Sequence, residues 1–183
     1  MKKRIVCVLL TLIMLLSLVP MGASAASHST SAAAITVLKQ MTKFESKCYH
    51  FAGEEFRTGY GTVCEEKHAF DKNGNPVNKT EVIDGKEVKY FDHTITEKKA
   101  DTALRAVLAE LDKKVNSFAS SNGLSLSQNQ HDALVVFSYN AGEGWMTGNG
   151  VLKTVIVKGG TANELLNAMA LRTNYADMNS RKL

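Results

Sequence analysis

The sequence lacks the short motifs that mark several large enzyme classes. No His-x-x-x-His spacing occurs among its five histidines, which are His28, His50, His68, His93 and His131, so no metal site is expected. The chain also has no phosphate-binding glycine loop and no nucleophile-elbow serine motif. We therefore expect no cofactor, and any chemistry is expected to rest on side chains alone.

Net charge is also small once the first residues are set aside. The formal charge is +4, and removal of Lys2, Lys3 and Arg4 lowers it to +1 (4 − 3). Nucleic-acid binding needs a basic surface that neutralises phosphates. We therefore expect no nucleic-acid partner.

The start of the chain has the three parts of a secretory signal peptide. The basic residues are followed by an apolar run at 5–19 and by the small-residue cleavage pattern Ala23-Ser24-Ala25. The run is short for a membrane helix, which needs roughly 20 apolar residues. We expect cleavage after Ala25, no stable membrane insertion afterwards, and a secreted or cell-envelope location; a retained membrane anchor is the alternative. Cleavage leaves 158 residues (183 − 25), which predicts one domain over 26–183.

Few cysteines remain after this cleavage. Cys7 leaves with the signal peptide, and Cys48 and Cys64 remain as a pair in an exported protein. A disulfide between them would close a loop of about 15 residues and contribute about 3 kcal/mol. Two unpaired thiols are the other interpretation.

The first half of the mature chain reads as one helix followed by strands. Apolar spacing from Ala34 onward predicts a helix that ends near Glu45, and 49–63 predicts short strands with glycine turns. A polar insertion follows at 65–94. Within it, Asp84-Gly85 lies between two β-prone runs and predicts a hairpin.

The second half reads as helices. Apolar spacing predicts a long helix from Thr96 to Asn122-Gly123, and capping boxes at Ser127 and Thr161 open two more helices. A short helix is expected at Val151–Val157. The fold class is therefore α+β, with a small α/β lobe of short antiparallel strands joined by a long helix to an all-helical lobe. We expect a substrate cleft between the lobes and a monomer.

The pair Phe44-Glu45, followed by Gly59-Tyr60-Gly61-Thr62, is the most informative feature. A carboxyl group at a helix end, facing a strand whose glycines let a polymer approach the backbone, suits the hydrolysis of a sugar chain. The pattern favours a glycan-cleaving protein.

Two segments resemble the phage-type lysozymes, which are muramidases of phage endolysins and of some exported bacterial proteins. "GYGT" at 59–62 resembles the family's Thr-Ile-Gly-Tyr-Gly-His or -Thr strand, and "LSLSQNQHDALVVFSYNAGEGW" at 124–145 resembles its central helix, which ends in Asn-x-Gly. The resemblance covers 35–62 and 95–153. It implies inverting hydrolysis of peptidoglycan, so glycan strands of the cell wall are the expected partner.

In the family, a glutamic acid protonates the leaving oxygen, and an aspartate and a threonine hold the attacking water. An inverting pair of carboxyl groups stands about 6.5–9.5 Å apart to leave room for that water. The acid also needs a raised pKa, which requires partial desolvation.

Two alignments place these roles on different residues. An alignment without gaps from Tyr49 to Gly59 puts Thr42, Phe51 and Arg57 at the three positions, which gives an inert site. An alignment on Phe44-Glu45 gives Glu45 as acid, Glu54 in place of the aspartate and Thr58 as the water-holding hydroxyl, at the cost of a deletion. Both stay open, and so does a merely solvated Glu45.

The remaining candidates are expected to contact substrate or to support the fold. Tyr60 is predicted to stack on a sugar or to lie in the core, and Asn140 to bind a sugar or to cap a helix. Trp145 is expected to anchor the helical lobe.

"SRKL" at 180–183 resembles the start of the family's last helix, and we expect this closing helix to be cut short. A catalytically lapsed lysozyme that only binds the wall and a membrane-tethered endolysin are the competing functions.

Overall fold

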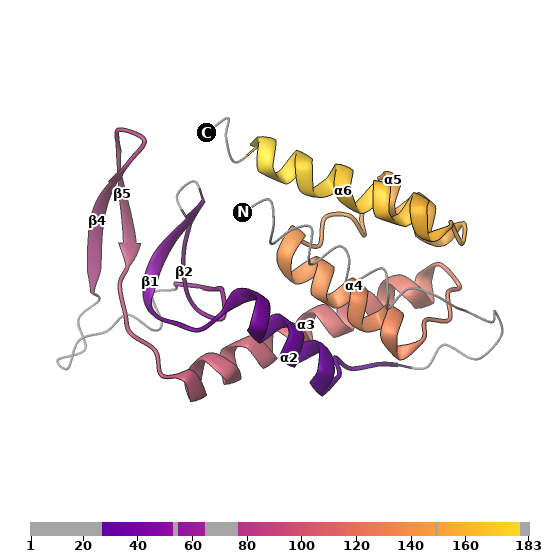
Figure 1. Ribbon diagram of the computed structural model, residues 1–183, viewed down its shortest axis with the longest axis horizontal. Helices are drawn as coiled ribbons and strands as arrows, with labels where there is room; N and C mark the ends of the chain where they lie inside the picture. Colours follow the sequence, from indigo (N-terminus) through magenta and orange to yellow (C-terminus); the bar gives the residue numbers. More distant parts are fainter. Residues whose placement is uncertain (1–26, 53–54, 65–76, 149, 180–183) are drawn as a thin grey trace. The chain divides into compact units, whose positions relative to one another are not determined.

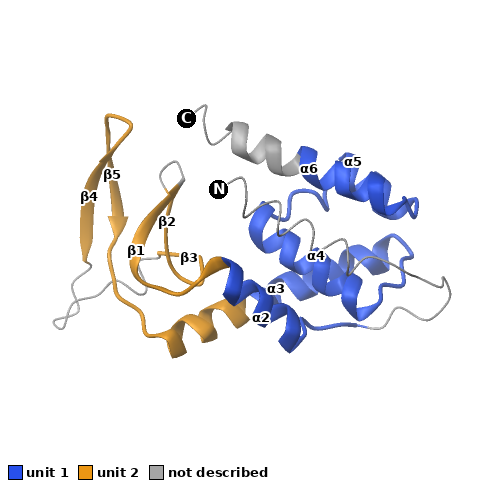
Figure 2. Ribbon diagram, viewed as in Figure 1, with its two compact units in different colours: residues 1–41, 107–179 blue, residues 42–106, 180–183 orange. Residues whose placement is uncertain are grey.

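The computed structural model describes residues 27–52, 55–64, 77–148 and 150–179. The predicted signal peptide at 1–25 lies outside these residues. The described chain forms two compact units: unit 1 comprises residues up to 41 and 107–179, and unit 2 comprises 42–106 (Figures 1 and 2). Strands lie in unit 2, unit 1 is helical, and the α+β prediction is confirmed. Among the described residues, no helix is both long and apolar enough to span a bilayer.

Unit 2 begins with a three-stranded antiparallel sheet. Its strands are β1 (Glu45–Ala52), β2 (Glu55–Gly59) and β3 (Thr62–Val63), in the order β1-β2-β3. The β1–β2 ladder pairs Glu45 with Gly59 and Tyr49 with Arg57, and its register shifts between these two pairs. This irregularity marks a bulge, which twists a strand locally.

The glycine turn after β2 is shaped by a helix. Gly59 has φ +64° and Gly61 has φ +93°, and the Gly61 N–H donates to the Thr58 carbonyl at 3.0 Å. A Cβ added at Gly59 would lie 2.9 Å from the Cβ of Ala100, in helix α3 (Glu97–Ser121). Glycine is therefore needed at position 59 for the backbone conformation and for the approach of α3. The sequence suggested that the glycine lets a sugar polymer approach the backbone. The structure instead explains Gly59 by the turn and by its contact with α3.

The predicted hairpin is present. Strands β4 (Asn78–Ile83) and β5 (Lys86–Phe91) pair along their whole length, from Asn78↔Phe91 to Ile83↔Lys86. The two turn residues, Asp84 and Gly85, have φ +50° and +78°, as the favoured two-residue turn requires. Residues 65–76 of the predicted insertion lie outside the described part of the chain.

A small apolar core and a disulfide stabilise unit 2. The rings of Phe56 and Tyr90 stack with centroids 3.7 Å apart, and Cys64 and Val88 are buried beside them. Cys48 in β1 and Cys64 after β3 form a disulfide, with Cα atoms 6.5 Å apart. The structure therefore shows the pairing, rather than two free thiols, and it links β1 to the end of the sheet.

The helices of unit 1 follow local sequence signals. They are the first ten residues of α2 (Ala32–Thr42), the second part of α3, and α4 (Gln128–Ala141), α5 (Val151–Val157) and α6 (Ala162–Asn179). Both predicted capping boxes form: Ser127 exchanges hydrogen bonds with Gln130, and Thr161 does so with Glu164. Each box satisfies backbone N–H groups at a helix start.

Helix α4 forms the buried centre of unit 1. Every residue from 130 to 138 is buried. Trp145 is 2% exposed, donates its indole N–H to the Ser138 hydroxyl at 2.9 Å and meets the Phe118 ring edge-on at 5.0 Å. The predicted anchoring role of Trp145 is therefore confirmed.

The segment before α2 is tied to unit 1 by side chains. Asn116 bonds both the N–H and the carbonyl of His28, at 3.1 and 2.7 Å. The Thr30 hydroxyl donates to Asp112 at 2.6 Å, and the Ser31 N–H donates to Asp132 at 3.0 Å. We call residues 28–31 the N-terminal strap.

Candidate functional site

Glu45 stands at the start of a strand, and not at the end of a helix. Helix α2 ends at Thr42, and Lys43 then adopts φ +58°, which a helix cannot contain. The expectation that this helix reaches Glu45 is therefore wrong. Glu45 is the first residue of β1 and its side chain is exposed, so the carboxyl group faces water in the free protein.

Thr58 lies directly beside the Glu45 backbone. Its side chain is 1% exposed, and its hydroxyl donates to the Glu45 carbonyl at 3.3 Å. Its own carbonyl accepts from the Thr62 hydroxyl at 3.1 Å. The structure thus brings these two predicted residues together, with Thr58 holding the start of β1. A water-holding role for its hydroxyl stays a prediction.

Tyr60 lies in the core, which is one of the two positions predicted for it. Its ring is 3% exposed and lies 5.8 Å from the Phe44 ring, and its hydroxyl donates to Glu97 Oε1 at 2.6 Å. This hydrogen bond, reinforced by burial, raises the pKa of Tyr60 to about 12. A ring so covered is not placed to stack on a sugar, because stacking needs an accessible face.

Arg57, which the gap-free alignment places in an inert site, lies on the side of the β1–β2 pair that faces away from the buried Phe56 and Thr58. Arg57 donates from Nε to the Glu55 carboxylate, and its guanidinium lies 3.7 Å above the Phe51 ring, which is 47% exposed. Tyr49 pairs with Arg57 across the ladder. The pKa of Tyr49 is raised, and burial is the main cause. The positive charge of Arg57 lowers this pKa, whereas the carboxylates of Glu45 and Glu55 raise it further. We call Glu45, Tyr49, Phe51, Glu55 and Arg57 the outer face.

Alternation along β2 was the signal that sequence reasoning missed. Glu55 and Arg57 are partly exposed, whereas Phe56 and Thr58 are buried. Because side chains of a strand point alternately to its two sides, Arg57 and Thr58 cannot share a face. The pattern assigns Arg57 to the side that bears the carboxylates and Thr58 to the core.

Asn140 occupies the last turn of α4, where its side-chain amide donates to the Val136 carbonyl at 2.9 Å. Its side chain is exposed, so sugar binding stays a prediction. Glu54, the second predicted carboxyl group, lies outside the described residues. The separation of the two carboxyl groups that an inverting pair requires therefore stays a prediction.

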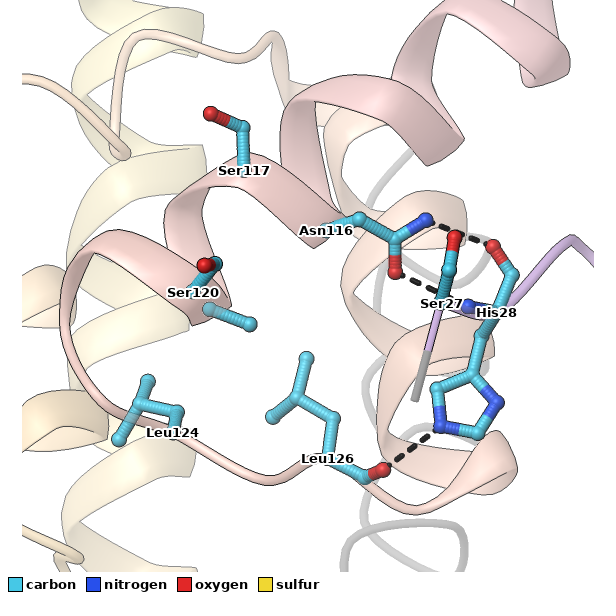
Figure 3. Close-up of a pocket in the computed structure, with 8 residues that line it drawn as sticks. Ser27, His28, Asn116, Ser117, Ser120, Leu124 and Leu126 are labelled. Carbon is cyan, nitrogen blue, oxygen red and sulfur yellow. Dashed lines mark hydrogen bonds between the residues drawn. The ribbon is translucent and has the colours of Figure 1, made fainter. Parts of the chain in front are cut away.

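A separate pocket lies in unit 1. It has a volume of about 300 Å³ and lies between the N-terminal strap, the end of α3 and the loop before α4 (Figure 3). His28 borders it and bonds the Leu126 carbonyl through Nε2 at 2.8 Å. Its described lining consists of serine, alanine, leucine, asparagine and histidine and includes none of the predicted catalytic residues. Among its described lining residues, none therefore offers a carboxyl group for acid catalysis.

A family model described as phage lysozyme matches residues 39–179, which is most of the chain and includes β1, β2, α3 and α4. The chain belongs to the phage lysozyme family. The resemblance expected from the sequence is thus confirmed, and membership implies a muramidase, which hydrolyses peptidoglycan. No curated protein matches the sequence.

For a phage lysozyme, the outer face joins the residue types that glycan hydrolysis uses. A carboxyl group supplies the proton, and an aromatic ring and a guanidinium supply apolar and hydrogen-bonding contacts. Of the two carboxyl groups on the outer face, that of Glu55 is engaged by Arg57. The catalytic role of Glu45 stays a prediction.

Proposed function

We propose that this phage lysozyme family member is an exported muramidase that cleaves the glycosidic bonds of the cell-wall glycan by inversion, with Glu45 as general acid. The observation that carries the proposal is the position of Glu45. Its backbone is fixed by the Thr58 hydroxyl and by pairing with Gly59, whereas its side chain is exposed. The acid is therefore firmly placed and still accessible to substrate.

Exposure in the free protein sets a condition on the mechanism. A general acid must lie against the oxygen that it protonates. A glycan strand that covers the outer face would bring a glycosidic oxygen beside the Glu45 carboxyl group and shield both from water. Glu54 is proposed to hold the attacking water, and Thr58, whose hydroxyl is buried on the core side of β2, to hold the backbone of Glu45 in place.

Release of reducing sugar ends from purified peptidoglycan tests the assignment. Glu45→Gln keeps the size of the side chain and removes its acidity, so we expect the rate to fall by about 10²–10⁴-fold. Glu87→Gln is the matched control, because Glu87 is an exposed glutamate in β5 of the same unit. Equal rates for the two variants would show that Glu45 is not the acid.

A second function is favoured by the state of Arg57. In the gap-free alignment Arg57 occupies the water-holding position, and the structure ties it to Glu55 and Phe51, where it cannot activate water. The protein would then bind peptidoglycan without cleaving it. Retention on cell walls with no release of reducing ends would support this function, and activity gained by Thr42→Glu would confirm the gap-free alignment.

Export is tested separately. N-terminal sequencing of the protein recovered from the culture medium is expected to start at Ala26, since the cleavage pattern ends at Ala25. A mature protein that starts at Met1 and stays in the membrane fraction would instead indicate a tethered endolysin.

A further inference from the structure

The disulfide of unit 2 has a histidine beside it. Cys48 lies in β1, Cys64 directly after β3 and His93 two residues after β5. One ligand atom from each lies within 4.8 Å of the other two, and the Cys48 Sγ stands 3.5 Å from the His93 Nδ1. Side chains from the middle of β1, the end of β3 and the segment after β5 thus converge on one point.

The Cys48–His93 distance matches a tetrahedral zinc site. Zn–S bonds of about 2.3 Å and Zn–N bonds of about 2.0–2.1 Å at tetrahedral angles place a sulfur and a nitrogen about 3.6 Å apart, and two sulfurs about 3.8 Å apart. Cys48 Sγ and His93 Nδ1 are already 3.5 Å apart, and Cys64 Sγ lies within 4.8 Å of the ring's ligand atom. The two sulfur atoms must separate, and opening of the disulfide permits this.

The backbone holds the three residues in place by means other than the disulfide. Next to His93, Thr94 forms an isolated bridge with Lys47, and the Ile95 N–H donates to the Ser46 carbonyl at 2.8 Å. The Cys64 N–H donates to the Phe56 carbonyl at 2.8 Å. The ligand positions are therefore expected to persist when the sulfur–sulfur bond opens.

The surroundings also suit a zinc–thiolate site. Cys64 is 7% exposed and packs with Phe56, Val88 and Tyr90, and Cys48 packs against the same cluster. An apolar shell limits the access of water and strengthens the attraction between thiolates and a cation. Soft thiolates with an imidazole select zinc over magnesium or calcium.

We propose that the reduced protein binds one Zn²⁺ through Cys48, Cys64 and His93 Nδ1, with a water molecule as the fourth ligand. A phosphine or dithiol reductant supplies two electrons and the two sulfurs take up two protons, giving two thiols. Zinc then displaces both thiol protons, and the neutral imidazole donates its Nδ1 lone pair. The disulfide thus links Cys48 to Cys64 in the oxidised state, and the cation would link both cysteines to His93 in the reduced state. The sequence-based expectation of no metal considered histidine spacing alone.

Metal titration of the mature protein tests this proposal. The protein is reduced with a phosphine, transferred to anaerobic buffer and titrated with Co²⁺ as a spectroscopic probe, then with Zn²⁺ against a chromophoric chelator. We expect one metal per chain, a thiolate-to-cobalt charge-transfer band, and no such band in the oxidised protein. His93→Asn should weaken zinc binding by at least about tenfold, because changes even behind a ligand cost about 10–100-fold.

His50→Asn is the matched control, since His50 lies in β1 and packs on Phe56 at 5.5 Å between ring centroids. Equal zinc affinity of the two histidine variants would overturn the proposal, because the thiols alone would then account for binding. Circular dichroism guards against loss of the fold on reduction. If the reduced protein unfolds, zinc must restore the fold in the parent and the His50→Asn protein and not in His93→Asn; failure to do so would also overturn the proposal.

Discussion

The hydroxyl group of Tyr60 lies inside unit 2 and donates to the carboxylate of Glu97. This hydrogen bond exists only while the phenol keeps its proton, and burial and the nearby negative charge also disfavour ionisation, so the pKa of Tyr60 is raised to about 12. An unfolded tyrosine ionises near pH 10. The folded state therefore holds the phenolic proton more tightly than the unfolded state. Its contribution to stability is complete below about pH 10 and is lost as pH rises towards 12.

Tyr60→Phe is expected to lower the free energy of unfolding by about 1.5 kcal/mol at pH 8, because a hydrogen bond to a charged group is lost. The difference between parent and variant should shrink at pH 11, where the parent has lost about half of this contribution. Urea unfolding at the two pH values measures it. Tyr49 and Tyr90, whose pKa values are also raised, are present in both proteins and cancel. A difference that is constant between pH 8 and pH 11 would contradict this account.

At the scale of single residues, sequence reasoning found positions better than roles. It selected Glu45, Thr58 and Tyr60, and the structure brings all three around the Gly59 turn. It could not assign burial, because Tyr60 is covered through a contact with Glu97, which is 37 residues away in sequence. Such contacts follow from tertiary packing, and a local pattern does not contain them.

Among the elements, the turn after β2 and the start of α3 depend on each other. Gly59 combines a left-handed backbone with a close approach to Ala100. Gly85 at the tip of the β4–β5 hairpin has a similar φ, +78°, and nothing lies within 4 Å of a Cβ built there. A substitution at Gly85 would therefore test backbone strain alone, whereas one at Gly59 would test backbone strain together with steric crowding.

Gly59→Ala is expected to destabilise the protein by about 3 kcal/mol and Gly85→Ala by about 1 kcal/mol, since both incur the left-handed strain and only the first overlaps a neighbour. Chemical denaturation of the two variants measures the difference. Ala100→Gly added to Gly59→Ala should remove the overlap, so the double variant should be more stable than the sum of its single changes predicts. Equal losses at positions 59 and 85 would show that Ala100 does not crowd the turn.

Element types were predicted well where the signal was local. The capping boxes at Ser127 and Thr161 and the Asp84-Gly85 turn each act within four residues, and all are present. The end of α2 was missed because Lys43 adopts a positive φ that lysine rarely takes, and nothing in its residue type marks it. The predicted cleft between lobes stays a prediction.

On the scale of the whole molecule, the two units are stabilised in different ways. Unit 1 has the larger apolar core, built around α4, together with the hydrogen bonds of the N-terminal strap. Unit 2 has a small core around Phe56 and Tyr90 and a disulfide. A small core gives little stability by itself, so the disulfide is expected to matter most in unit 2.

Hydrogen exchange followed by mass spectrometry tests this division, in metal-free buffer so that no cation replaces the disulfide. Reduction should speed amide exchange in β1, β2 and β3, because about 3 kcal/mol of loop restraint is removed there. Peptides from α4 should exchange at an unchanged rate, since no described cysteine lies in unit 1. Faster exchange in α4 would mean that the protein unfolds as one cooperative body.

The N-terminal strap has a consequence for how far the chain tolerates shortening from its N-terminus. The first backbone groups held by a side chain belong to His28, and those of Thr30 and Ser31 follow. An aminopeptidase that stopped at Ser27 would leave every one of these anchors intact. One that also removed residues 28–31 would strip Asp112 and Asn116 of their strap donors and leave Asp132, beside the buried His131, with Gln128 as its hydrogen-bond donor. Preparations of the protein with ragged N-termini should therefore divide sharply at this point into stable and unstable forms.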